Sequence, residues 1–515
     1  MTTKRKEPAE PSTRRTRQRT LSSTEPQNRR DPFEAFPWDI ACLVLHLLSP
    51  QDLVRAQQVD RGWRGFVERW LIAEGRRALP WEWRPDIEGL AEEEAIRHVK
   101  QAVVEHTAYK KLAAGNASCA RRYENTVPGT GLFSVKGDYV VWHADNRIRY
   151  QNLAFEPDGS LHQIEELDVT VMADNLRYLE VNAEGYLYYQ MWYYRNDQGQ
   201  EEGYRHHVVY LPTGTHVWRQ RIQSNARLLA VGRERIYFYD MPDGDGANNL
   251  FFMARDVVTG RRLYRRPCAN RIPGDAAPVP VQRLEGEEVL VALRVEPNFR
   301  LFVQIIDGKN GVISQVIGTA VWLGGEHIIP DSQNAGRFAI VSHSQNEHRY
   351  VKIQKFTENV DNDGLFDSVS IEWLAPIPRT INRLAIHPYR NLAVTIEHRR
   401  AIPWIREIRV NDDPPTDQQT FPHDDPPRPD RWLQVERGQK VSLPVKYKHH
   451  KSRRKFLRKL MDSGTQQPPV RFVGWDRVLM ATSPEQFNCL LDFRFRLQTN
   501  FALTDGPHPD TLEIR

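Results

Sequence analysis

The sequence predicts an α+β multidomain protein, in which a helical N-terminal part precedes a longer all-β part. The chain has 515 residues, which is too long for one small core at about 100–200 residues per domain. Apolar residues recur with helical spacing up to about residue 112. From about residue 132 onward, short β-branched and aromatic runs alternate with Gly, Asn and Asp turns.

The composition excludes several classes of protein. No apolar run approaches the ~18 residues of a membrane helix, and the first residues show no secretory signal, so no membrane partner is expected. The four cysteines are isolated, which argues against disulfides or a zinc site and predicts a reducing compartment, nuclear or cytoplasmic. No G-x-S-x-G, H-E-x-x-H or Walker A motif is present, and the EF-hand-like start at 359–364 has Ser370 where the bidentate Glu is required. We therefore expect no cofactor, no metal and no catalytic residue.

Residues 1–30 form a basic tail that is expected to be disordered. They hold nine Lys or Arg and three Glu, whereas the whole chain has a net charge of +5. The other residues are therefore close to neutral, and a nucleic-acid-binding fold is not expected. Apart from Met1, Leu21 is the only large hydrophobic residue of the tail, which cannot support a core.

Two helical segments follow the tail, namely residues 31–79 and a linker at 80–131. Ser49 and Pro50 suit the start of a helix inside the first segment. On either side of them, hydrophobic residues fall at i, i+3, i+4, i+7 and i+8, the spacing of one helix face. These residues are Ile40, Leu43, Val44, Leu47 and Leu48, and then Trp63, Phe66, Val67, Trp70 and Leu71. In the linker, residues 90–112 show a similar spacing.

The first helical segment resembles an F-box. The family pattern runs Leu-Pro-x-Glu-Ile, then Ile-Leu, then a Leu before Pro-x-Asp-Leu, and later Val-x-x-x-Trp-Arg. Phe36 stands here for Leu, Asp39 for Glu, and Arg64 matches the last position. An ordinary helical hairpin would not explain all these residues at family spacing. The resemblance assigns adaptor binding to Phe36, Pro37, Ile40, Val44, Leu45, Leu48, Pro50, Asp52, Leu53, Val59 and Trp63.

The resemblance implies a non-catalytic role. An F-box binds the Skp-type adaptor of SCF ubiquitin ligases, and through it a cullin, while other subunits transfer ubiquitin. The chain would then be a substrate-recognition subunit, similar to F-box proteins of filamentous fungi. Pro37 and Leu53 are expected to be partly exposed. Two alternatives stay open, namely an F-box scaffold outside the ligase and a propeller enzyme (hydrolase or quinoprotein) with an N-terminal helical module.

Seven short runs of one form repeat along the β part, and their start positions differ by 47, 50, 53, 49, 54 and 86 residues. The runs begin at Tyr139, Tyr186, Ile236, Val289, Phe338, Leu392 and Val478. A period near 50 with several strands per unit predicts a radial array, because each sheet buries its faces against its neighbours. We expect an all-β propeller of about seven blades, with six or eight as alternatives.

The long last step marks an expected insertion. Blades are assigned to residues 132–410, and the last blade and C-terminus to 470–515. Residues 411–469 contain Asp-Asp-Pro-Pro twice and then a basic stretch, so a largely disordered insertion is predicted. The basic runs at 4–19 and 446–459 could act in nuclear import.

The substrate-binding residues are not defined by the sequence. Several Arg and Tyr residues lie near expected turns, where clustered Arg could hold a phosphorylated or acidic protein segment. That hypothesis requires them to gather near the propeller axis; otherwise they form a solvated surface. They are Arg195, Tyr204, Arg261, Arg262, Arg265 and Arg266. Asp256-Val-Val-Thr-Gly260 is similar to a quinoprotein repeat turn but occurs once in that form, so a β-turn with glycine at positive φ is expected.

Overall fold

A computed structural model describes most of the two structured parts of the chain. The described residues are 37–48, 50–57, 61–80, 83–85, 87–124, 132–154, 162–193, 203–221, 226–240, 251–267, 278–295, 301–319, 327–343, 351–374, 381–397, 400–411, 430–436, 439–441, 470–474, 476–481 and 487–494. The chain divides into two compact units, residues 1–78 and 79–515. The tail at 1–30 lies outside the described residues. No described helix has the length and apolarity of a membrane span.

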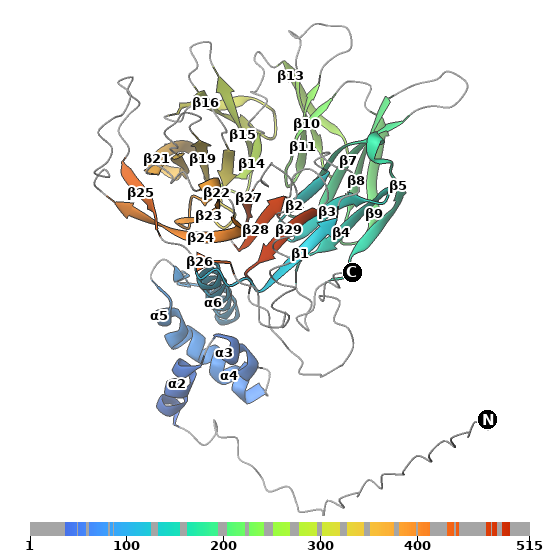
Figure 1. The fold of residues 1–515 in the computed structure, drawn as a ribbon. Coiled ribbons are helices and arrows are strands. Elements are labelled where there is room, and N and C mark those ends of the chain that lie inside the picture. The colour runs from blue at the N-terminus through green and yellow to red at the C-terminus, as the bar shows by residue number, and fades with distance from the viewer. Residues whose placement is uncertain are drawn as a thin grey trace, which may run out of the picture. The chain divides into compact units, whose positions relative to one another are not determined.

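The first unit consists of short helices (Figure 1). They are α2 (Trp38–Leu47), α3 (Pro50–Gln57), α4 (Arg61–Trp70), the π-helical turn η1 (Leu71–Gly75) and α5 (Arg76–Ala78). Pro37 precedes α2, and its carbonyl accepts the first backbone hydrogen bonds of that helix. The buried side chains come from all three main helices, so the unit has a small core of its own.

The second unit begins with α6 (Glu92–Ala113), which has three glutamates in its first turn and two lysines in its last. Both sets of charges complement the helix dipole. Leu112 is buried together with Leu392 and Val470, which lie on strands of two neighbouring sheets. Trp83 adds a second attachment, because its ring packs against His106 and Tyr109 of α6. The guanidinium of Arg390 lies 4.1 Å from the same ring centroid. These contacts fix α6 to the β domain.

Five antiparallel sheets have four strands each. Four sheets are continuous in sequence, and the fifth combines one early strand with three late ones. The strands are β2 (Phe133–Lys136), β3 (Tyr139–Ala144), β4 (Arg147–Asn152) and β5 (Glu165–Thr170); β6 (Leu176–Val181), β7 (Tyr186–Tyr193), β8 (Gly203–Tyr210) and β9 (Thr215–Arg221); β10 (Arg227–Val231), β11 (Arg235–Asp240), β12 (Phe251–Asp256) and β13 (Arg262–Pro267); β14 (Val279–Gln282), β15 (Glu288–Val295), β16 (Leu301–Asp307) and β17 (Ile313–Gly318); and β1 (Cys119–Glu124), β27 (Val470–Val473), β28 (Arg477–Ala481) and β29 (Phe487–Asp492).

The remaining strands form one nine-stranded sheet. They are β18 (His327–Pro330), β19 (Arg337–His343), β20 (Val351–Asn359), β21 (Leu365–Leu374), β22 (Ile381–His387), β23 (Leu392–Glu397), β24 (Arg400–Asn411), β25 (Arg431–Val435) and β26 (Gln439–Lys440). β25 joins two halves, since it pairs in parallel with β21 and antiparallel with β24. Short 3₁₀ turns lie at Ala173–Asn175 and Val360–Asn362. Because of this continuous sheet, the count of seven blades stays a prediction.

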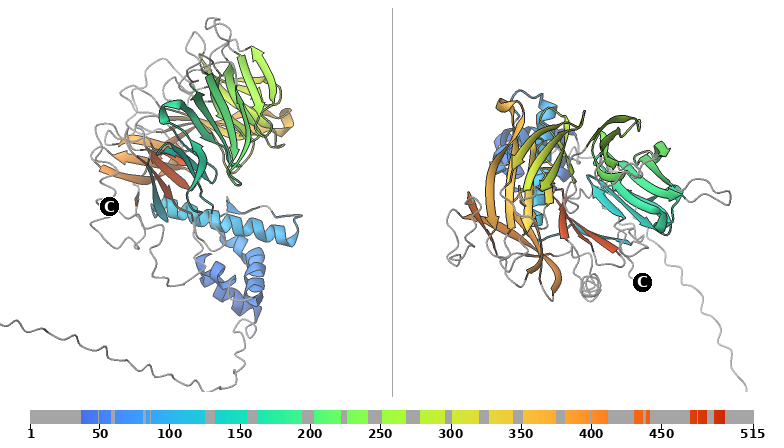
Figure 2. Two further views of the ribbon diagram at one scale, coloured as in Figure 1. Left: turned by 90° about the vertical axis from the view of Figure 1, so that its right-hand side faces the viewer. Right: turned by 90° about the horizontal axis from the view of Figure 1, so that it is seen from above.

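The sheets follow one another in a propeller-like arrangement (Figures 1 and 2). The first strand of one sheet contacts the first strand of the next, as β2 does with β6, β6 with β10, β10 with β14 and β14 with β18. β22, at the other end of the nine-stranded sheet, contacts β27. The fourth strand lies at the opposite edge. β1 pairs with β29, so segments far apart in the sequence close the last sheet.

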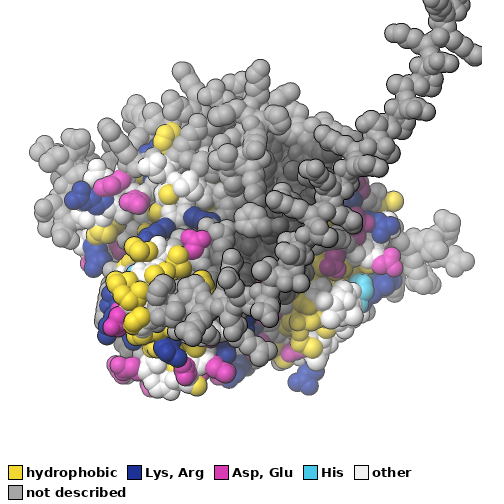
Figure 3. Space-filling model, turned by 90° about the horizontal axis from the view of Figure 1, so that it is seen from below, with side chains coloured by type: hydrophobic (Ala, Val, Ile, Leu, Met, Phe, Trp, Pro, Cys, Tyr) yellow, Lys and Arg dark blue, Asp and Glu magenta, His cyan; other side chains and the backbone are white. Residues whose placement is uncertain are grey.

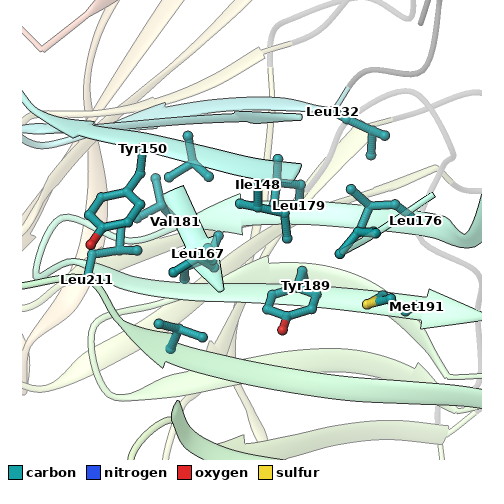
Figure 4. Close-up of a cluster of buried hydrophobic side chains, with 14 residues drawn as sticks. Leu132, Ile148, Tyr150, Leu167, Leu176, Leu179, Val181, Tyr189, Met191 and Leu211 are labelled. Atoms are coloured by element: carbon teal, nitrogen blue, oxygen red, sulfur yellow. The ribbon is translucent and has the colours of Figure 1, made fainter. Parts of the chain in front are cut away.

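The seven repeated runs all lie on strands. Each of these strands follows the first strand of a sheet or, in the nine-stranded sheet, the first strand of one of its two halves. These strands are β3, β7, β11, β15, β19, β23 and β28. Such strands have neighbours on both edges and both faces, which explains their nearly continuous apolar sequences. Figure 4 shows one resulting core, in which Ile148 and Leu167 of one sheet meet Leu179 and Tyr189 of the next.

A repeated contact links neighbouring sheets through glycine turns. Trp218 of β9 donates its indole N–H to the carbonyl of Val257 at 2.8 Å, and its ring covers Gly260. Tyr264 of β13 covers Gly311 in the same way. Each ring thus fills the space where a Cβ would stand. The expected positive φ of Gly260 is confirmed at +68°.

Two predicted boundaries are wrong. The linker assigned to 80–131 as helical also contains the strand β1, and the insertion assigned to 411–469 as disordered contains β25 and β26. Both errors have one cause, since these strands are stabilised by partners distant in sequence, β29, β21 and β24. Other residues of 411–469, including the basic run at 446–459, lie outside the described part.

Candidate adaptor-binding and substrate-binding surfaces

An exposed hydrophobic stripe runs along α2. Ile40 is 43% exposed, Leu43 61% and Leu47 86%. Their spacing of i, i+3 and i+7 places them on one face of the helix. Ala41 and Leu45 are the buried residues of α2. The hydrophobic face predicted from the sequence is therefore exposed in part. Figure 3 shows hydrophobic side chains in patches bordered by charged ones on the face seen from below.

Aromatic contacts fix α2 against α4. The ring of Trp38 stacks on Phe66 at 6.0 Å, and the guanidinium of Arg69 lies 5.4 Å from the Trp38 ring. His46 meets the edge of Trp70 at 5.2 Å. Because these contacts occupy the inner side of α2, the stripe of Ile40, Leu43 and Leu47 has no share in the core of this unit.

The structure distributes the predicted adaptor-binding residues over several environments. Pro37 and Ile40 are exposed, and Val44, Leu48, Asp52 and Trp63 are half-buried. Leu45 and Leu53 are buried. The expected partial exposure is confirmed for Pro37 and wrong for Leu53, which packs into the helical core. Phe36 and Val59 lie outside the described residues, and for Pro50 only the helix is described.

Two exposed leucines were missing from the predicted surface, Leu43 and Leu47. Hydrophobic periodicity places them with Ile40 but cannot say which face is buried. The sequence contains one indication that Leu43 is exposed. Leu43 occupies a position where the F-box pattern commonly has a polar residue. A hydrophobic residue at a position that is usually polar indicates an exposed face used for contact.

Three of the arginines considered for substrate binding do not meet the condition of gathering near the propeller axis. Arg262, Arg265 and Arg266 belong to β13, the edge strand of its sheet opposite to β10, which contacts the neighbouring sheets. Arg265 already pairs with Asp240 at 2.6 Å. The hypothesis of an axial arginine cluster is therefore wrong for these three residues, which fit the alternative of a solvated surface. Arg261 precedes β13, Tyr204 lies on β8, and Arg195 lies outside the described residues. No three His, Cys, Asp or Glu side chains of the described residues cluster as a metal site would require.

A charged cluster fastens the closing sheet to its neighbour. Asp138, in the turn after β2, accepts hydrogen bonds at 3.0 Å from both Arg477 and Arg494. Arg494 also pairs with the buried Asp492 at 2.9 Å. Burial would raise the pKa of Asp492, but the charge of Arg494 and of the other nearby arginines outweighs it and holds the pKa at about 2.

Asp476 in this cluster should make stability depend on pH. Its burial raises the pKa to about 6, against the partial compensation of Arg477. Between pH 4 and pH 6 the folded state then binds the proton more tightly than the unfolded state, so the contribution of Asp476 to stability falls as the pH rises. We expect Asp476→Asn to gain stability relative to the wild type on going from pH 4.5 to pH 7. Thermal unfolding of both chains at the two pH values measures this, and a pH-independent difference would contradict it.

No protein-family model matches the chain, and no curated protein is similar to it in sequence. Solved structures do resemble it. The β-propeller domain of Cps50 (Swd1) from Myceliophteria thermophila is 10% identical with a TM-score of 0.37, over 73% of this chain and 96% of that one. Sqt1 from Saccharomyces cerevisiae is 10% identical at 0.34, over 73% and 99%. A prolyl endopeptidase is 14% identical at 0.34, over 64% and 47%. The propeller assignment therefore rests on the strand order of this chain.

Proposed function

We propose that this chain is the substrate-recognition subunit of an SCF-type cullin ubiquitin ligase. The first unit would bind the Skp-type adaptor, and the propeller would hold a protein substrate. The observation that carries the proposal is the exposed stripe of Ile40, Leu43 and Leu47, which lies inside the segment that resembles an F-box. A helical unit of this size that leaves three large hydrophobic residues in water is suited to a permanent partner.

The propeller part of the proposal includes seven blades. The halves β18–β21 and β22–β26 of the nine-stranded sheet each repeat the strand order of the separate sheets, and we count them as two blades joined by β25. Propellers present loops from every blade on rigid faces, which suits protein binding. Ubiquitin transfer would follow from proximity, so the chain needs no catalytic residue of its own. Nuclear import through the basic runs at 4–19 and 446–459 also remains part of the proposal.

Reconstitution tests the proposal directly. The purified chain, mixed with a purified Skp-type adaptor, should elute with it in size-exclusion chromatography as a 1:1 complex. Addition of a cullin should shift this complex further. Failure to bind the adaptor would contradict the proposal, whereas adaptor binding without cullin recruitment would favour the scaffold role. Hydrolytic or redox activity of the isolated chain would favour the enzyme alternative.

A further inference from the structure

One end of sheet β6–β9 carries two arginines over the same tyrosine ring. The guanidinium carbon of Arg205 lies 4.3 Å from the ring centroid of Tyr193, and that of Arg219 lies 5.7 Å from it. The three residues come from the adjacent strands β8, β7 and β9. Contact with an aromatic face restricts the long arginine side chains before any ligand binds, which lowers the entropic cost of binding.

Contacts with a histidine and a second tyrosine fix the position of the Tyr193 ring. The ring of Tyr193 stacks against His207 with 6.3 Å between centroids, and its hydroxyl lies 3.4 Å from Nε2 of that histidine. His207 stacks in turn on the buried Tyr189 at 4.5 Å. Burial, and then the charges of Arg219, His216 and Arg205, lower the pKa of His207 to about 3. His207 is therefore neutral near pH 7, and it supports the ring without adding charge.

The two arginines have no counter-ion among the residues that the structure describes. Neither Arg205 nor Arg219 forms a salt bridge there. Arg265 provides the contrast, because it lies 3.6 Å from the ring centroid of Phe251 but is neutralised by Asp240. Two like charges beside one ring repel each other, and a bound anion would relieve that repulsion.

We propose that Arg205, Tyr193 and Arg219 bind a carboxylate-rich segment of a partner protein. The guanidinium fork matches a carboxylate in a bidentate geometry, and two forks on neighbouring strands suit two acidic side chains of one extended segment. Single-stranded nucleic acid fits less well, because it needs a free aromatic face for base stacking and Tyr193 is already in contact with guanidinium groups and His207. If the partner is the ligase substrate, the acidic segment is the part by which the propeller recognises it. That last step rests on the proposed function, whereas the binding of an acidic segment does not.

Fluorescence anisotropy with the full-length chain tests the proposal. The probe is a labelled 12-residue peptide of alternating Glu and Gly, with a Gln/Gly peptide and a phosphoserine/Gly peptide as comparisons. We expect the Glu peptide to bind, and R205Q/R219Q to weaken it by about tenfold or more, as expected for lost charge-assisted hydrogen bonds. R262Q removes an exposed arginine from β13 and should change affinity less than about twofold, which is the range of a remote surface substitution. Tyr193→Phe keeps the ring and should bind normally, whereas Tyr193→Leu should bind weakly.

Several results would overturn the proposal: no binding of the Glu peptide to the wild type, equal binding by R205Q/R219Q, equal binding of the Gln peptide, or binding of the phosphoserine peptide alone. If R205Q/R219Q fails to fold, R205K/R219K keeps both charges but loses both forks, and unchanged affinity in that variant would also overturn it. Adaptor binding is measured on the same variants. It should be unchanged, so the failure of this inference is distinguishable from the failure of the proposed function.

Discussion

Replacing Leu43 and Leu47 together by glutamate should abolish binding of a Skp-type adaptor and leave the chain folded. Both side chains are largely exposed, at 61% and 86%, and substitutions at such positions usually change stability by less than about 0.5 kcal/mol. Each leucine buried in a complex would contribute about 1.5–3 kcal/mol. The variant loses both contributions and would bury two carboxylates. We therefore expect the dissociation constant to rise more than about 100-fold.

Isothermal titration calorimetry with the purified adaptor measures this effect. A matched control is Val360→Glu with Val369→Glu, two β-domain valines that are 73% and 62% exposed. The control adds the same charge to hydrophobic positions that are also largely exposed and should bind like the wild type. Unchanged adaptor binding by the leucine variant would show that the stripe is not the interface, and the F-box assignment would lose its main support.

Gly260→Ala should destabilise the propeller strongly. Gly260 has φ of +68°, which costs an alanine about 1–2 kcal/mol. In addition, its Cβ would lie 2.8 Å from the ring of Trp218, which is fixed by a hydrogen bond to the carbonyl of Val257. Overpacking of this kind costs about 1–3 kcal/mol more. We expect a total loss of about 2–5 kcal/mol in the free energy of unfolding.

Gly286→Ala separates the two causes. Gly286 has φ of +86°, but a Cβ there would meet no atom closer than 4.0 Å, so only the backbone cost of about 1–2 kcal/mol is expected. Urea unfolding midpoints, followed by circular dichroism, compare the variants. In a Trp218→Leu background, which is itself less stable, Gly260→Ala should cost less than in the wild type, because the clashing ring is absent. Equal losses at both glycines would mean that the ring contact contributes nothing measurable.

The sequence was sufficient where neighbours in the chain determine the structure. The run that begins at Tyr186 predicted β7, because an apolar run between turns indicates a buried strand. α6 followed from the periodic hydrophobic residues of 90–112. The strand β1 was missed because Cys119-Ala-Arg-Arg-Tyr-Glu124 has little local strand pattern and acquires its structure from β29. Local patterns carry no information about such a partner.

The candidate surfaces were harder to predict for a related reason. Periodicity grouped Ile40, Leu43 and Leu47, but only the packing of α4 decides which side of α2 is covered. The arginines of β13 were assigned to a binding face from their position near a turn, since the sequence does not say which strand of a sheet lies at its edge. Arg205 and Arg219 lie inside strands and meet only through pairing of β7, β8 and β9.

The pairing of β1 with β29 also sets an order on biosynthesis. The first strand of the β domain ends at Glu124, and its partner begins at Phe487, so the ribosome must deliver nearly the whole domain before the ring can close. Until then β1 offers an unpaired edge, which is a site for wrong pairing with other chains. The helical unit at residues 37–78 has its own core and emerges before the β domain. The helical unit can thus fold while the β domain is still incomplete.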